Sequence, residues 1–347
     1  MGDGGRRGWG GLSCCRRRDT IGGHLSGVLE VRRPSLELVG LLLLLLPASL
    51  RAQVDAGALA ERFTRMTAVS GFERAALDSV QALLPGARRD RAGDVVLERG
   101  SGAATLIVCP FDEAGYVVGG IRDDGWLTLR RVGRAPNALF DQYHEGQRIM
   151  LWGRHGTLPG VIAVHSTHLQ RGRGGNEAPF NVDDAFVDIG ASSGVEARAA
   201  GAGLLSPVAR EKRPFRYGDG LLAGPDAGRR GACAALVAAA ATAGAPSGGR
   251  LVVAVAVEQE LGQRGLRTLA HNAGPFTRTI IVDGTAGAAG SIAVRADTVA
   301  TRVLPELGQV ARWGLTSRNT GTPVETVSLA DIEALRVRLV AEMGGGR

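Results

Sequence analysis

Two kinds of residue are scarce in this 347-residue chain, and their scarcity excludes several classes of protein. Only 15 residues are aromatic, and of the 41 basic residues only Lys212 is a lysine. Few aromatic side chains argue against a protein that stacks the bases of single-stranded nucleic acid. The 52 glycines follow no three-residue period, which excludes a collagen-like helix. With 44% hydrophobic and 22% charged residues, the composition is that of a globular protein.

Cysteine is also scarce, and its four positions fall into two groups. Cys14 and Cys15 lie near the N-terminus, whereas Cys109 ends a strand-like run and Cys233 lies in an alanine-rich, helix-like run. Two cysteines cannot build a scaffold of several disulfides or a four-thiolate zinc site. We therefore expect Cys109 and Cys233 to be two small, buried, free thiols.

Excess positive charge is concentrated in the N-terminal segment. The formal net charge is +7, but the first 52 residues contain eight arginines and only four acidic residues. The rest of the chain therefore has 33 basic and 30 acidic residues and a net charge of only +3. A domain this close to neutrality lacks the strongly basic composition that is typical of nucleic-acid binding. We predict no nucleic-acid partner.

The first 52 residues have the features of an export signal. Arg32 and Arg33 precede the apolar run Leu38–Leu46, and small residues then lead to a cleavage site near Ala52 and Gln53. Nine apolar residues are too few to span a bilayer, so we expect no transmembrane segment in the mature chain. The prediction is a periplasmic or extracellular protein. Because the stretch before the paired arginines is unusually long, we expect translation to begin downstream of the first methionine.

The hydrophobic pattern predicts an α/β domain that is interrupted by a small β-barrel. Residues 59–84 have helical spacing with a break at Ser70 and Gly71, and residues 221–347 alternate helical segments with continuous apolar strands. Such strands indicate a sheet that is covered on both faces. Residues 116–220 instead contain short strands with glycine and aspartate turns, which is typical of a barrel. We expect residues 53–115 and 221–347 to form one α/β domain around a barrel of residues 116–220.

Individual elements follow from the same patterns. The expected strands are Val95–Arg99, Thr105–Cys109, Tyr116–Ile121, Trp126–Val132, Arg148–Trp152, Val161–Val164, Leu251–Val257 and Thr279–Val282. The expected helices include Glu73–Leu84, Gly231–Ala243, Leu266–His271 and Leu329–Met343, the last begun by a capping box of Ser328 and Asp331.

Acidic residues follow three of the predicted strands of the α/β domain. Asp112 and Glu113 come after Thr105–Cys109, Glu258 and Glu260 come after Leu251–Val257, and Asp283 comes after Thr279–Val282. The carboxyl ends of strands form the usual functional edge of an α/β domain, and converging carboxylates can bind divalent metal ions. Ordinary loop acids or helix caps are the alternative at this point.

Eight segments in colinear order resemble the glutamyl aminopeptidase family of dinuclear metallopeptidases, which includes the tetrahedral, dodecameric aminopeptidases. The segments are SGFE at Ser70, DRAGDVV at Asp90, CPFDEAGYVV at Cys109, DDAFVDIGASSGVEA at Asp183, GACAAL at Gly231, VAVEQELGQRG at Val255, IIVD at Ile280 and TPVETVSLADIEAL at Thr322. The resemblance covers about residues 59–342. It implies a phosphorylase/hydrolase-like three-layer α/β domain, an inserted small β-barrel for assembly and access, and two zinc or cobalt ions. Some members of this family are named cellulases or endoglucanases.

The family's chemistry uses five metal ligands and a carboxylate base, and the resemblance places most of them on unsuitable residues here. The family's AHxDExG reads CPFDEAG, so the ligand histidine falls at Pro110, while Asp112, which orients that histidine in the family, is kept. The bridging aspartate falls at Gly228 or Arg229, and Asp226 lies two or three residues too early.

The remaining positions divide between retained and replaced residues. In EQELG the general base falls at Gln259, whose amide cannot accept a proton at neutral pH, and the following ligand is kept as Glu260. Asp283 matches the fourth ligand, and the last, a histidine, falls at Gly321. The remnant ligands are therefore Glu260 and Asp283.

The resemblance implies an exported homologue of metallo-aminopeptidases that has lost catalysis and binds no metal. We expect Glu260 and Asp283 to lie beside Asp112 and to be neutralised by Arg229 or Arg230 in place of zinc. A peptide or small molecule in the cleft and a homo-oligomer formed through the barrel are the expected partners.

Two alternatives remain open from sequence. One is an active metal-dependent aminopeptidase or other hydrolase that uses zinc or cobalt in an altered arrangement, with carboxylates drawn from Asp112, Glu113, Asp226, Glu258, Glu260 and Asp283. The other is a non-catalytic envelope scaffold that binds carbohydrate or peptide. His165 and His168 have a spacing that could bind metal, but they lie in the predicted barrel, outside the family's ligand set.

Overall fold

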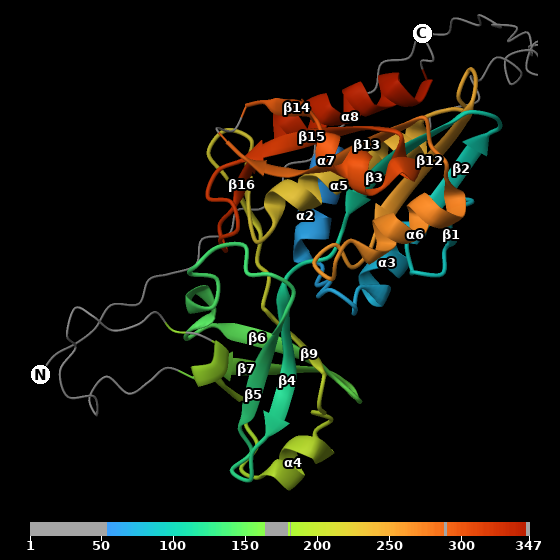
Figure 1. Ribbon diagram of the computed structural model, residues 1–347. Coiled ribbons are helices and arrows are strands. Elements are labelled where there is room, and N and C mark those ends of the chain that lie inside the picture. The colour runs from blue at the N-terminus through green and yellow to red at the C-terminus, as the bar shows by residue number, and fades with distance from the viewer. Residues whose placement is uncertain (1–53, 164–179, 181, 288–289, 345–347) are drawn as a thin grey trace, which may run out of the picture. The chain divides into compact units, whose positions relative to one another are not determined.

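A seven-stranded sheet forms the centre of the α/β domain in the computed structural model, which describes residues 54–163, 180, 182–287 and 290–344 (Figure 1). The strand order is β1-β2-β12-β3-β13-β15-β14. The strands are β1 (Arg88–Arg89), β2 (Val95–Gly100), β3 (Ala104–Pro110), β12 (Arg250–Ala256), β13 (Arg278–Ala286), β14 (Ile292–Ala296) and β15 (Gln309–Ser317). The central strands β12, β3, β13 and β15 pair in parallel, and the outer pairs are antiparallel.

Helices cover both faces of this sheet because its central strands are apolar on both sides. In β3, Ile107 and Cys109 belong to one core cluster, while Leu106 and Val108 belong to the other. The first face is covered by α2 (Ala56–Arg65), α3 (Arg74–Gln81), α5 (Ala227–Thr242) and α8 (Leu329–Gly344), and the second by α6 (Arg264–Ala273) and α7 (Thr298–Val303). The three-layer α/β architecture is confirmed.

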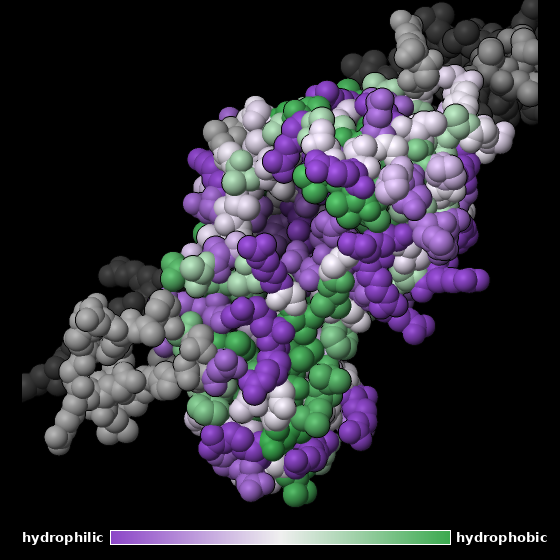
Figure 2. Space-filling view, in the orientation of Figure 1, coloured by the Kyte–Doolittle hydropathy of each residue, from purple (hydrophilic) through white to green (hydrophobic). Residues whose placement is uncertain are grey.

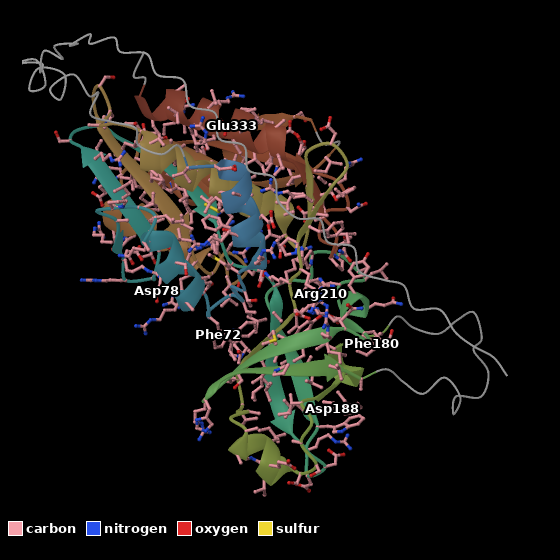
Figure 3. All side chains as sticks on the ribbon, turned by 180° about the vertical axis from the view of Figure 1, so that it is seen from behind. Phe72, Asp78, Phe180, Asp188, Arg210 and Glu333 are labelled. Atoms are coloured by element: carbon pink, nitrogen blue, oxygen red, sulfur yellow. A yellow bond between two sulfur atoms is a disulfide. The ribbon has the colours of Figure 1, made fainter. Side chains whose placement is uncertain are left out.

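The predicted barrel is present as a closed ring of six strands in the order β4-β5-β8-β7-β6-β9. They are β4 (Gly115–Ile121), β5 (Leu127–Val132), β6 (Arg148–Gly153), β7 (Gly156–Ile162), β8 (Phe186–Asp188) and β9 (Pro207–Arg210), with the short helix α4 (Gly194–Ala199) before β9. Figure 3 shows the barrel from behind, with Asp188 at the end of β8 and Arg210 at the end of β9. Alternating residues such as Val118, Leu129 and Leu151 fill its interior.

A small three-stranded sheet, which the sequence did not predict, links distant parts of the chain. It consists of β10 (Phe215–Tyr217), β11 (Leu221–Ala223) and β16 (Thr326–Ser328). Antiparallel pairing of Leu222 with Val327 brings the segment before α5 beside the segment before α8. The Gly224 N–H then donates to the Glu325 carbonyl oxygen over 2.9 Å. This contact places Glu325 at the start of α5.

Helix α5 begins four residues earlier than its sequence pattern suggested. Its first turn contains Gly228, Arg229 and Arg230, and Asp226 precedes it in the left-handed region at φ 54°. The pattern concealed this start because glycine and arginine interrupt the apolar run. The predicted cap of α8 is confirmed, since the Asp331 N–H donates to Ser328 Oγ over 3.3 Å.

The expectation of two free thiols is wrong. Cys109 in β3 and Cys233 in α5 form a disulfide, with their Cα atoms 5.5 Å apart and both side chains fully buried. Counting cysteines excludes a multi-disulfide scaffold, but only the packing of α5 on the sheet brings these two residues together. The disulfide ties α5 to the strand that ends next to Asp112.

Some sequence predictions lie outside the described residues. These are the export signal in the first 52 residues and the pair His165 and His168. In the described ranges, no helix has the length and apolar character needed to cross a bilayer.

Candidate functional site

Residues from three strands and one helix meet at the carboxyl edge of the parallel strands. Asp112 follows β3, Glu260 follows β12, and Asp283 lies within β13. The first turn of α5 adds Arg229, which bonds to a group from each of these three residues. Parallel strands present their carboxyl ends on one edge of a sheet, which explains why residues far apart in sequence converge here.

A cavity of about 340 Å³ opens at this edge. Figure 2 shows a recess with hydrophilic walls in this part of the molecule. The lining residues are Ala114, Arg134, Ala135, Pro136, Asp226, Arg229, Glu260, Asp283, Gly284, Thr320, Gly321 and Glu325.

The Arg229 guanidinium lies between the two remnant carboxylates. Its Nε donates to Asp283 Oδ1 over 3.2 Å, and its Nη1 donates to Glu260 Oε1 over 3.1 Å and to the Asp112 carbonyl oxygen over 2.7 Å. Burial alone would lower the pKa of Arg229, but the charges of Asp283 and Asp112 outweigh burial and raise that pKa. The expected neutralisation by arginine is confirmed, and Arg229 rather than Arg230 supplies it.

Asp112 is fully buried and accepts hydrogen bonds through one carboxylate oxygen. Its Oδ2 accepts hydrogen bonds from Ser70 Oγ and, over 3.0 Å, from the Glu260 N–H. Its Oδ1 is buried and has no hydrogen-bond partner among the described residues. Pro110, two residues earlier, is the last residue of β3 and has no side-chain nitrogen to bind a metal. Asp112 therefore positions the loop after β12 and has no histidine at position 110 to orient.

Gly228, one of the two candidates for the bridging-aspartate position, and Gly321, at the position of the last histidine, are both tightly enclosed. A Cβ on Gly228 would lie 2.5 Å from Glu325 Oε1, and a Cβ on Gly321 would lie 2.9 Å from Pro136 Cβ. Gly321 also has φ +73°, which disfavours any other residue. The space that a bridging aspartate or a histidine would need is thus taken by other groups.

Gln259, at the position of the general base, lies in the loop between β12 and α6. Its side chain makes no hydrogen bond within the part of the chain that the structure describes, and it does not line the cavity. The Glu258 carboxylate does not line the cavity either. It pairs with Arg264, whose Nη1 donates to both carboxylate oxygens at 3.1 and 2.9 Å.

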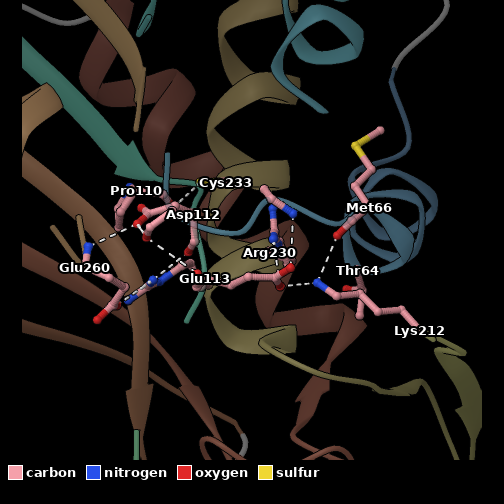
Figure 4. Close-up of polar contacts among 12 residues, drawn as sticks. Thr64, Met66, Pro110, Asp112, Glu113, Lys212, Arg230, Cys233 and Glu260 are labelled. Atoms are coloured by element: carbon pink, nitrogen blue, oxygen red, sulfur yellow. Dashed lines mark hydrogen bonds and ion pairs between the residues drawn. The ribbon is translucent and has the colours of Figure 1, made fainter. Parts of the chain in front are cut away.

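Glu113 forms a second buried ion cluster with Lys212 and Arg230 (Figure 4). Its Oε2 is paired with both Lys212 Nζ and Arg230 Nη2, and its Oε1 accepts from the Ala68 N–H over 3.0 Å. Burial alone would raise the pKa of Glu113, but the charges of Lys212 and Arg230 lower it to about 2. The Arg230 guanidinium also lies 4.1 Å above the centre of the Phe111 ring. Glu113 is therefore committed to this cluster.

Asp226 and Glu325 face the cavity without a cationic partner. Among the described residues, neither carboxylate forms an ion pair, and Asp226 accepts no side-chain hydrogen bond. Glu325 accepts from the Gly228 N–H at 2.9 Å, Ser317 Oγ at 2.8 Å and the Gly321 N–H at 3.0 Å. Burial, followed by the charge of Asp226, raises the pKa of Glu325 to about 7, and burial with the charge of Glu113 raises that of Asp226.

These residues do not fit a dinuclear metal centre. In the described ranges, no group of three or more histidine, cysteine, aspartate or glutamate residues is arranged to hold a metal ion. The two remnant carboxylates are already bound to the Arg229 guanidinium, which would repel a metal ion. Four of the six carboxylates of the altered-site alternative form ion pairs: Glu260 and Asp283 with Arg229, Glu258 with Arg264, and Glu113 with Lys212 and Arg230. The Asp112 carboxylate accepts hydrogen bonds from Ser70 Oγ and the Glu260 N–H, and Asp226 forms no ion pair among the described residues.

Sequence reasoning missed several residues of this site. They are Ser70, Arg134, Lys212 and Glu325. Lys212 carried one signal, since it is the only lysine in a chain that otherwise uses arginine. The others reach the site through the barrel loop, the small sheet and the turn before α3, which no local pattern reveals.

The fold is a phosphorylase/hydrolase-like three-layer α/β domain with an inserted β-barrel, and comparisons with known proteins identify its family. The profile of the M42 glutamyl aminopeptidases matches residues 93–298, so the chain belongs to that family. The resemblance stated from sequence is thereby confirmed.

Curated relatives and solved structures agree with this assignment. Over 66% of this chain, the sequence is 26% identical to the FrvX protein of Escherichia coli. Over 57% of this chain, it is 27% identical to lysyl aminopeptidase of Pyrococcus furiosus. The matches span 64% and 58%, respectively, of those two proteins. An aminopeptidase from the archaeon Desulfurococcus kamchatkensis superimposes with a TM-score of 0.74 at 18% identity, covering 84% of this chain and 95% of that one. The TET1 peptidase of Pyrococcus horikoshii gives 0.72 at 20% identity, covering 83% and 99%.

Proposed function

We propose that this protein is an exported member of the M42 family that binds a small ligand in its cleft and does not hydrolyse peptide bonds. One observation carries the proposal: the Arg229 guanidinium is bonded to Glu260, Asp283 and the Asp112 carbonyl oxygen, where the family pattern places metal. An internal cation keeps the remnant carboxylates paired without any ion from solution. Metal-assisted hydrolysis needs a metal ion that activates water and polarises the carbonyl group, and this arrangement supplies neither.

The enclosure of the glycines supports the same proposal. Restoring ligands at Gly228 and Gly321 would require displacement of Glu325 and of the loop that contains Pro136. Gln259 cannot act as a general base at neutral pH. Several groups would therefore have to move together before a two-metal site could form.

Metal content and turnover test the proposal directly. We expect protein purified without chelator to contain well under one equivalent of zinc, and its melting temperature to stay unchanged after treatment with a chelator. Aminoacyl-anilides should not be hydrolysed with added zinc or cobalt, and the variant Gln259→Glu should remain inactive because a base without a metal-bound water has nothing to deprotonate. Tightly bound stoichiometric metal, or turnover that Glu260→Ala abolishes, would contradict the proposal and favour an altered-site hydrolase.

Export is the proposed localisation, and the disulfide supports it. Structural disulfides such as Cys109–Cys233 form and persist in oxidising compartments. The mature protein should begin at Gln53 or a neighbouring residue, which N-terminal sequencing of protein from the producing organism would establish. A mature chain that begins at Met1 would overturn this proposal.

Assembly through the barrel is the proposed quaternary arrangement. A similar structure, PhTET1-12s, is described as a dodecamer in the asymmetric unit, and the TET1 peptidase of Pyrococcus horikoshii is described as able to assemble into a tetrahedron or a large octahedral shell. Light scattering of the purified mature protein would test whether this chain also assembles, and a strictly monomeric mass would contradict it.

A further inference from the structure

The cavity contains two carboxylates that lack a counterion. Arg229 is paired with Glu260 and Asp283, and Lys212 and Arg230 are paired with Glu113. Arg210 and Arg134 form no ion pair among the described residues, and the Arg210 Nη1 donates to the Tyr143 carbonyl oxygen, so neither is bonded to Asp226 or Glu325. Asp226 and Glu325 line the same cavity and have no cationic partner among the described residues. Burial and then the charge of a neighbouring carboxylate raise the pKa of each carboxyl group, although the charges of Lys212, Arg229 and Arg230 partly offset the rise at Asp226. A cationic group from a ligand would neutralise the charges of both carboxylates.

The lining of the cavity also includes a buried acidic residue and an exposed basic residue. Glu325 is 3% exposed, whereas Arg134 is exposed and forms no ion pair in the described part of the chain. Arg134 belongs to the loop that follows β5. Its position is anchored on both sides, since Gly133 packs closely against Glu260 and Asn137 Nδ2 donates to the Gly321 carbonyl oxygen over 2.9 Å.

We propose that the cavity binds a free α-amino acid as a zwitterion, with its ammonium group between Asp226 and Glu325 and its carboxylate at Arg134. The proposal rests on the proposed function, because a ligand held in this way is bound and not cleaved. A guanidinium matches the planar carboxylate group with two parallel donors. The cavity volume of about 340 Å³ lies at the small end of ligand pockets, which suits a molecule of this size.

The proposed acidic and basic contacts distinguish a free amino acid from related molecules. A residue at the N-terminus of a peptide has an ammonium group but a neutral amide in place of its carboxylate, so it leaves Arg134 without a partner. An N-acetylated amino acid has a carboxylate but no cation, so it leaves Asp226 and Glu325 uncompensated. A polar group that is desolvated without a partner costs affinity, and the cost is larger for a charged group.

Thermal denaturation of the mature protein with each of the twenty L-amino acids, at millimolar concentration, tests the proposal. At least one should raise the melting temperature, and calorimetric titration of that amino acid should show one site. Its N-acetyl derivative should not bind detectably, and its carboxamide should bind at least tenfold more weakly.

Two variants assign the contacts. Asp226→Asn keeps a residue that tolerates the left-handed backbone at φ 54°, and it should weaken the best amino acid at least tenfold. Arg134→Gln should weaken it by a similar factor and should leave affinity for the carboxamide unchanged, because that ligand has no carboxylate to lose. Asp219→Asn and Arg154→Gln, at exposed positions that do not line the cavity, are matched controls and should bind like the original protein.

Several results would overturn the inference. They are the absence of binding by any amino acid, equal binding of the N-acetyl derivative, tighter binding of a dipeptide than of its N-terminal amino acid, and stabilisation by zinc or magnesium chloride alone. Turnover of aminoacyl-anilides is measured in the same samples. Absence of both binding and turnover would refute this inference while leaving the proposed loss of hydrolysis intact, whereas turnover would refute the proposed function itself.

Discussion

Replacing Arg229 by methionine should lower the free energy of unfolding by about 3–5 kcal/mol, because the change leaves the carboxylates of Glu260 and Asp283 close together without their cation. The Asp112 carbonyl oxygen loses a hydrogen bond of 2.7 Å at the same time. The Arg229 side chain is 19% exposed, so solvent screens its ion pairs only in part. Denaturation by urea, followed by circular dichroism, would measure the effect.

Two further variants separate the loss of the cation from the loss of packing. The combination Arg229→Met, Glu260→Gln and Asp283→Asn removes the unpaired charges and should recover a large part of the lost stability. Arg264→Met breaks the pair with Glu258, but the Arg264 side chain is 61% exposed, so this control should cost about 1 kcal/mol or less. If Arg229→Met is no more destabilising than this control, Arg229 does not act as the internal substitute for metal.

Replacing Lys212 by methionine should lower the free energy of unfolding by about 3–5 kcal/mol as well. The ammonium group is paired with Glu113 and donates to the Met66 carbonyl oxygen over 2.9 Å, and the Lys212 and Glu113 side chains are only 5% and 3% exposed. Lys212→Arg should also destabilise the protein, because a planar guanidinium does not fit a buried site shaped for an ammonium group. If so, the site itself requires a lysine in a chain that otherwise uses arginine.

The effect of Lys212→Met should depend on pH in a defined direction. Because the pKa of Glu113 is lowered from 4.5 to about 2, the ion pair contributes its full stability above pH 4.5 and loses it as the pH falls through about 2. The stability difference between the original protein and the variant should therefore be constant from neutral pH down to about 4.5 and should shrink below it. Arg213→Met is a suitable control, since the Arg213 side chain is 65% exposed. A difference that grows with falling pH would contradict the assigned pairing.

Much of the fold follows from local patterns. Continuous apolar strands such as Leu251–Val257 and Thr279–Val282 can only be central strands of a covered sheet, and they occur as β12 and β13. The short strands after Gly115 form the barrel. The small sheet of β10, β11 and β16 could not be predicted, because strands of three residues have no measurable alternation and pair across more than one hundred residues.

The sequence by itself determined the family, and it aligned Pro110, Gln259 and Gly321 with ligand and base positions of the family pattern, because these matches depend only on which residue stands at each position of a colinear motif. Tertiary structure alone decided which groups surround the acidic residues at the sheet edge. It paired Arg229 with Glu260 and Asp283, joined Cys109 to Cys233, and committed Glu113 to Lys212. These contacts join residues from separate strands, helices and loops, and their geometry arises from the packing of α5 against the sheet edge, which no local pattern contains.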